Sequence, residues 1–80
     1  MRVVKEIPSE LYNLTIYSWN NKYLLKFEQG GLEQTYKINE TEILMDSDWD
    51  SLLNDLFIQK VIHRFDEMGK DFSEAVKLII

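Results

Sequence analysis

The acidic side chains near the middle of the chain have the spacing with which a calcium-binding loop begins. Asp46, Asp48 and Asp50 alternate along the sequence, and such loops take their first oxygen ligands from alternate positions. The loop also needs a glycine at its turn and a bidentate acid at its close, but Ser51 and Phe57 occupy those positions. We therefore interpret the segment as the capped start of a helix on a solvated acidic link, and we expect no metal there.

His63, the single histidine, is the other side chain whose type suggests chemistry. Histidine acts as a general base when it faces a nucleophile such as serine or cysteine and an acid orients its ring. On a helix, Asp66 and Glu67 lie three and four residues after His63, which is the spacing of a local ion pair. This pattern is typical of an exposed helical histidine, so the sequence predicts neither an enzyme nor a bound cofactor.

A mixture of apolar and basic side chains on one face of a predicted sheet favours binding instead of catalysis. The candidate binding residues are Tyr17, Trp19, Leu24, Lys22, Lys26 and Lys37. Aromatic side chains are enriched at protein interfaces, so the first interpretation is a protein partner or a second copy of the chain in a homodimer. The second is single-stranded nucleic acid, with bases stacked on the aromatics and lysines on phosphates. The third is structural: cross-strand aromatic pairs stabilise the sheet, or the final helix covers them.

These residues lie in a predicted antiparallel meander of four strands. The strands are expected at residues 2–7, 14–19, 22–28 and 32–38. Pro8 ends the first strand because it cannot donate to a strand ladder. Asn20-Asn21 and Gly30-Gly31 are predicted to form two-residue hairpin turns, because asparagine and glycine tolerate a positive φ. A strand and not a helix follows Gly30-Gly31, which argues against a phosphate-binding loop.

The two turns predict registers that agree with each other. With Asn20-Asn21 at one hairpin tip, Ile16 faces Leu25, and with Gly30-Gly31 at the next tip, Leu25 faces Tyr36. A slip of one residue in either hairpin would move these side chains to the other face. The predicted core face consists of Leu14, Ile16, Tyr23, Leu25, Phe27, Tyr36 and Ile38.

Helices are expected after an acidic link at residues 39–47. Ser47 is the expected N-cap, and the acids that follow it suit a helix N-terminus. The helix is predicted over about residues 48–68 and ends at Gly69. Asp71 then caps a short final helix.

The long predicted helix carries two apolar stripes that point in different directions. The first consists of Trp49, Leu52, Leu53, Leu56 and Phe57, and the second of Ile58, Val61, Ile62, Phe65 and Met68. One sheet face would cover one stripe, so we expect a bend near residues 57–59, or packing on two partners such as the final helix and a second subunit. The predicted fold is α+β, a single domain of residues 1–80 with a long helix and a short C-terminal helix on one face of the sheet.

Composition restricts the class of protein. Eighty residues without cysteine make one small domain with a thin stability margin and no disulfide. The net charge of −5 is concentrated in residues 39–80, and an acidic protein repels nucleic acid at long range. The sequence shows no signal-peptide pattern and no apolar run near the ~20 residues of a membrane span. We therefore expect a cytoplasmic protein that does not enter a membrane.

Three stretches of the sequence carry a resemblance. VVKEIP, WNNKYLLKFE and LEQTYKI, followed by an acidic link and a tryptophan-containing helix, resemble a family of small uncharacterised bacterial proteins. The resemblance covers most of the chain and implies four strands followed by a helix. It carries over no functional residue, because no activity is assigned to that family. The order of elements is also similar to that of single-stranded nucleic-acid binders of the Pur-alpha and Whirly kinds, whose arginine-rich strand faces this chain lacks.

Overall fold

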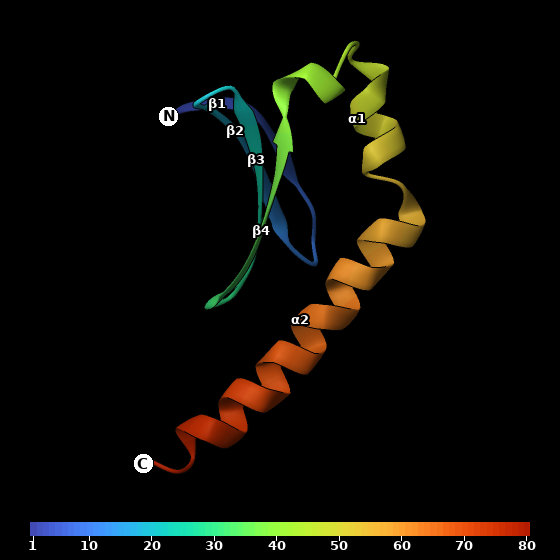
Figure 1. Ribbon diagram of the computed structural model, residues 1–80. Helices are drawn as coiled ribbons and strands as arrows, with labels where there is room; N and C mark the ends of the chain where they lie inside the picture. The colour runs from blue at the N-terminus through green and yellow to red at the C-terminus, as the bar shows by residue number, and fades with distance from the viewer.

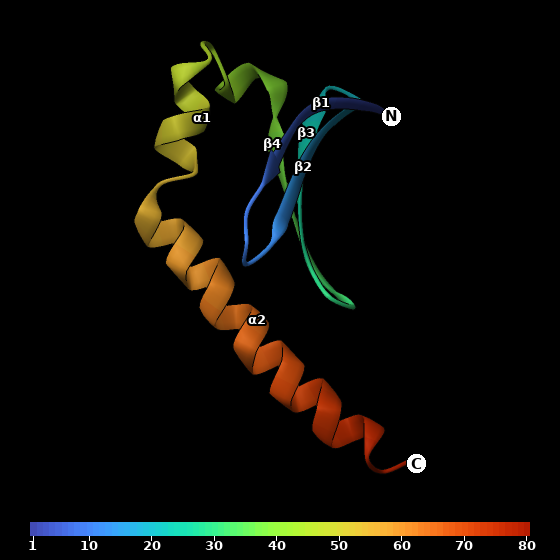
Figure 2. The ribbon, with the colours of Figure 1, turned by 180° about the vertical axis from the view of Figure 1, so that it is seen from behind.

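The computed structural model describes residues 1–80 and has an α+β fold in two layers, with a sheet on one side and helices on the other (Figure 1 and Figure 2). The elements are β1 (Arg2–Pro8), β2 (Asn13–Trp19), β3 (Lys22–Gln29), β4 (Leu32–Asn39), the 3-10 turn η1 (Glu40–Glu42), α1 (Ser47–Leu52) and α2 (Asp55–Val76). The strands pair in sequence order, each antiparallel to the next. The predicted four-stranded meander is therefore confirmed.

Two tight turns set the register of the sheet. Asn20 and Asn21 have φ values of 56° and 64°, the left-handed conformation that a two-residue hairpin of this twist requires. Gly30 has a φ of 58° in the next turn. As predicted, Ile16 pairs with Leu25 across the first hairpin, and the second hairpin keeps the same face inward.

The edge strand β1 contains an irregularity that the sequence analysis did not predict. Val3 pairs with Tyr17 and Lys5 with Ile16, so Val4 is an extra residue in the ladder. Such a bulge twists an edge strand and reverses which side its next residues face. Lys5 consequently lies on the helix side, where its ammonium is 3.6 Å from the carboxylate of Asp46.

The hydrophobic core lies between the sheet and the two helices. Its buried members are Leu14, Ile16, Leu25, Phe27, Trp49, Val61 and Phe65. The other residues of the predicted core face, Tyr23, Tyr36 and Ile38, are partly buried and pack against this cluster. Tyr23 meets Trp49 of α1 edge to face, with ring centroids 5.0 Å apart. The prediction of which sheet face is inside is confirmed.

The predicted long helix is two helices, and the break falls earlier than the bend we expected. Asn54 has an extended ψ of 162°, and its side-chain oxygen accepts a hydrogen bond from the backbone amide of Phe57 at 3.0 Å. Asparagine is among the best N-cap residues, so this bond caps a new helix, α2, which begins at Asp55. The two apolar stripes thus lie mainly on different helices. The buried residue of α1 is Trp49, and the buried residues of α2 are Val61 and Phe65.

The prediction that a helix ends at Gly69 and a separate short helix follows is wrong. α2 continues through Gly69 to Val76, and the short helix, α1, comes before it. A glycine stops a helix when it adopts a left-handed conformation, and Gly69 does not. A Cβ at Gly69 would lie 3.6 Å from the Leu32 side chain, so this glycine lies where the β3–β4 turn packs on the helix. No helix is long and apolar enough to span a membrane.

Candidate functional site

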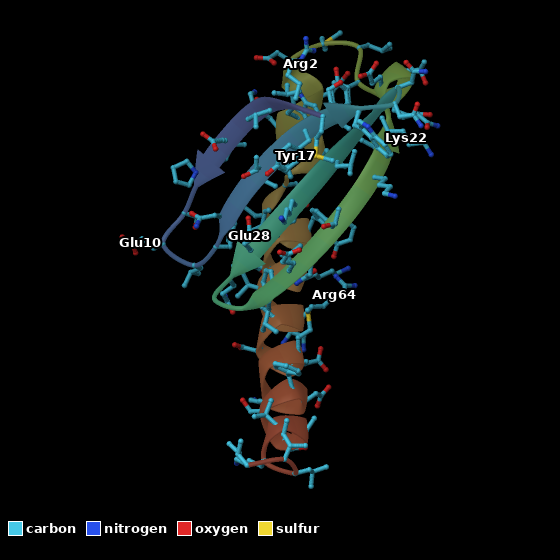
Figure 3. The ribbon with its side chains drawn as sticks, turned by 90° about the vertical axis from the view of Figure 1, so that its left-hand side faces the viewer. Arg2, Glu10, Tyr17, Lys22, Glu28 and Arg64 are labelled. Carbon is cyan, nitrogen blue, oxygen red and sulfur yellow. The ribbon has the colours of Figure 1, made fainter.

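The sheet face that points away from the helices, called here the outer face, contains the candidate site (Figure 3). It takes every second side chain of each strand, and both helices lie on the opposite side of the sheet. The six predicted site residues all lie on it: Tyr17, Trp19, Lys22, Leu24, Lys26 and Lys37. The structure therefore brings the whole predicted set together and leaves it uncovered.

An apolar row crosses the outer face from one edge of the sheet toward the other. Val3, Tyr17 and Leu24 are neighbours on β1, β2 and β3, and Lys37 continues the row on β4. Tyr17 and Leu24 are half-buried by their neighbours, whereas Val3 is 51% exposed. Val3 is not among the predicted site residues, because the bulge in β1 decides which face this residue joins.

Trp19 is the most prominent aromatic side chain of this surface. It stands directly opposite Lys22 in the first hairpin and is 51% exposed. A large aromatic residue left half in water on a flat sheet face is a common anchor of protein contacts.

The charges of the outer face separate along the strands. Lys22 and Lys37 lie toward the end nearest η1, while Glu28 and Glu33 face each other at the opposite end. Lys22 and Glu28 mark these two ends in Figure 3. Glu6, opposite Thr15, adds a further acid on the β1 side. The sequence analysis identified the lysines of this surface and not its acids.

Lys26 is held by the acidic end of the outer face. Its ammonium lies 3.5 Å from the Glu33 carboxylate. The negative charge of Glu33, and after it that of Glu28, raises the pKa of Lys26 above its usual value of 10.5. Lys26 is thus already paired within the chain, and Lys22 and Lys37 are the lysines of this face that form no ion pair.

Asp48, in the first turn of α1, stabilises the turn that precedes this helix. One carboxylate oxygen of Asp48 accepts hydrogen bonds from the backbone amides of Leu44 and Met45, at 2.8 and 3.1 Å. The prediction that Ser47 caps the helix is wrong: Asp46 is the N-cap, without a side-chain bond, and Ser47 is the first helical residue. The Asp48 carboxylate therefore holds the segment that enters the helix, and no side chain caps the amides of the first helical turn.

His63 lies on the exposed side of α2, as its spacing predicts. Its Nε2 atom is 3.4 Å from the Glu67 carboxylate one helical turn later, and both side chains are largely exposed. The contact is an ion pair when the imidazole is protonated, and it is an ordinary surface contact of a helix.

Comparisons with protein-family models, with curated proteins and with solved structures returned no significant match. The resemblance to a family of small bacterial proteins therefore stays a prediction. Function is inferred from the surface of the molecule itself.

Proposed function

We propose that this chain is a non-catalytic interaction module that self-associates, with the outer face as a contact surface. The observation that carries the proposal is its exposed area. A compact monomer of 9.6 kDa is expected to expose about 5,100 Å², whereas this chain exposes 6002 Å². The excess of about 900 Å², to which the protruding end of α2 also contributes, is close to the roughly 800 Å² that each partner buries in a standard protein interface.

The outer face has the composition of a contact surface. Tyr17, Trp19 and Leu24 would be its anchors, because aromatic and apolar side chains gain most when water is excluded from them. Tyr17 and Leu24 are half-buried among their neighbours on the sheet, and Trp19 beside them is exposed.

The charges of this face favour a second copy of the chain as the occupant. Two sheets stacked face to face about a two-fold axis across the strands have their strand ends exchanged. The lysine end of each copy then lies over the acidic end of the other, and Lys22 approaches Glu28 of the second copy. Complementary potentials of this kind select one orientation over its alternatives.

Single-stranded nucleic acid is the competing occupant of the same face. Trp19 opposite Lys22 would provide a stacking surface beside a cation. Three observations weigh against it: Lys26 is paired with Glu33, the face carries acids at one end, and the chain has a net charge of −5. Backbone phosphates would be repelled by most of this surface.

Sedimentation equilibrium of the unmodified chain and of three variants tests the proposal. Trp19→Ala and Leu24→Glu should each raise the dissociation constant of the self-associated form at least about tenfold, because each removes an anchor. Leu11→Glu is the matched control, since Leu11 is 55% exposed in the loop between β1 and β2 and lies off the outer face.

Thermal unfolding of each variant shows whether its fold is retained. A monomeric mass for the unmodified chain at tens of micromolar contradicts the proposal. Salt-sensitive binding of a labelled single-stranded oligonucleotide by that monomer, lost in Trp19→Ala, would instead support the competing occupant.

A further inference from the structure

The end of α2 beyond Gly69 extends past the sheet. Figures 1 and 2 show this part of the helix running beyond the β3–β4 turn from both sides. Leu32, the first residue of β4 after that turn, packs at Gly69. Beyond this point Phe72 is 62% and Ile79 82% exposed, whereas Val61 and Phe65 are buried under the sheet. We call residues 69–79 the overhang.

The apolar stripe of α2 continues from the core into the overhang on the same side of the helix. Phe65, Phe72, Val76 and Ile79 follow each other at spacings of seven, four and three residues, which place them in one line. Hydrogen bonds from the amides of Leu78 and Ile79 to Ala75 and Val76 carry the helical turn past the end of α2. One side of α2 is therefore buried against the sheet in the first half of the helix and exposed to solvent in the overhang.

The overhang accounts for the elongated shape of the molecule. The radius of gyration is 14.5 Å, against about 12 Å for a compact domain of this length. The longest dimension is 47 Å and the shortest 18 Å. An apolar helix side standing out from a small domain in this way is a surface that a partner would cover.

We infer that the overhang docks on the overhang of a second copy, with the two helices antiparallel. The inference rests on the proposed self-association and adds a contact on the opposite side of the sheet from the outer face. If the partner's α2 ran parallel to this one, it would clash with the sheet that covers the first half of the apolar stripe of α2. A reversed helix avoids that clash, because its own sheet lies beyond the end of this chain's α2.

Charge supports a second copy as the occupant. The whole chain carries −5, but the overhang holds two basic residues, Lys70 and Lys77, and two acidic ones, Asp71 and Glu74. Two overhangs therefore approach without net repulsion, although the rest of the two chains repel each other.

A groove beside the overhang has room for the end of the partner's stripe. It runs between the β3–β4 turn and α2, and Gln29, Leu32, Gly69 and Ser73 are among its lining residues. In an antiparallel pair centred near Glu74, symmetry places Ile79 of the second copy beside Gly69. Because Gly69 has no side chain, Ile79 of the second copy can approach the α2 backbone beside Leu32.

Sedimentation equilibrium of the full chain tests the contact. Phe72→Glu and Ile79→Glu should each raise the dissociation constant at least about tenfold. Leu56→Glu is the matched control, because Leu56 is 64% exposed and lies on the opposite side of α2 from Phe72. Unchanged association of Phe72→Glu, or equal dissociation of Leu56→Glu, overturns the inference.

The orientation has its own test, because the chain contains no cysteine. Ala75→Cys lies near the symmetry centre and should form a disulfide-linked dimer in a glutathione redox buffer. Position 64 lies on the same side of α2 as position 75. In an antiparallel pair the two copies of position 64 are at opposite ends of the contact, so Arg64→Cys should form no disulfide-linked dimer. Efficient linking through position 64 overturns the antiparallel arrangement.

The failures of the two proposals can be told apart. A monomeric unmodified chain contradicts both the proposed function and this inference. A self-associating chain that responds to Trp19→Ala and Leu24→Glu but not to Phe72→Glu contradicts this inference alone.

Discussion

The side-chain amide of Gln34 donates a hydrogen bond to the backbone carbonyl of Val61 at 2.9 Å, in the buried space between β4 and α2. Its oxygen accepts a bond from the Tyr36 hydroxyl at 2.6 Å. Gln34 is the one buried polar side chain of the core, and both ends of its amide are used. A directional bond of this kind selects which turn of α2 lies over β4, whereas apolar packing alone would tolerate a shift along the helix.

We expect Gln34→Ala to lower the free energy of unfolding by about 1–3 kcal/mol, because it removes two bonds and leaves the Tyr36 hydroxyl without its partner. Urea unfolding followed by circular dichroism measures the loss. Thr35→Ala, exposed on the neighbouring position of β4, should change stability by no more than about 0.5 kcal/mol. Equal effects of the two substitutions would show that the Gln34 bonds contribute little.

Gly69 and Gly30 should respond to alanine in opposite directions. At Gly69 the added methyl meets Leu32 at an ordinary distance of 3.6 Å, and alanine is favoured over glycine in a helix by about 0.5–1 kcal/mol. At Gly30 the backbone has a φ of +58°, which costs a residue with a Cβ about 1 kcal/mol or more. The melting temperature should rise in Gly69→Ala and fall in Gly30→Ala. A fall in both would mean that Leu32 cannot accommodate the methyl group.

The charge separation of the outer face predicts how charge variants pair. Lys22→Glu and Glu28→Lys should each weaken self-association about fivefold, because each places like charges opposite each other in the reversed stack and exposed ion pairs are worth up to about 1 kcal/mol. An equal mixture of the two variants should associate more tightly than either alone, as measured by sedimentation equilibrium at low salt. Lys60→Glu, which is exposed on α2 outside both proposed contacts, tests for an effect of net charge alone. A mixture no tighter than its components would contradict the reversed stacking.

The pKa of Lys26 should be higher in the unmodified folded chain than in a variant whose Glu33 charge is removed. Glu33 and Glu28 raise its pKa above 10.5, so folding favours the charged ammonium. The resulting stabilisation is complete below pH 10.5 and is lost as the pH rises through the folded-state pKa. Titration of the Lys26 side chain by NMR should give a lower midpoint in Glu33→Gln than in the unmodified chain. Identical midpoints would show that the ion pair at 3.5 Å does not persist in solution.

Local signals along the chain are enough to specify the meander and its inward face. Asn20-Asn21 and Gly30-Gly31 act locally, through the φ values that their types tolerate, and strand alternation then places every neighbour. For this reason the strand pattern alone places the six candidate residues together on the outer face. Val3 was not among them, because its face depends on a bulge that forms only when β1 pairs with β2.

The division of the helical half into α1 and α2, and the apolar surface that α2 leaves exposed, depend instead on long-range packing. A glycine in a helix is either a stop or a place of close approach, and at Gly69 the contact with Leu32 accompanies an uninterrupted helix. Likewise, Asn54 competes with continuation of α1 through a cap bond from the Phe57 amide. Trp49 packs on Tyr23 of β3, whereas the Val61 carbonyl accepts a bond from Gln34 of β4, so the two helices lie against different strands. Local propensities of a few tenths to about 1 kcal/mol per residue are too small to settle such alternatives. The burial of apolar side chains against the sheet is larger, and it ends at Gly69 because the sheet ends there.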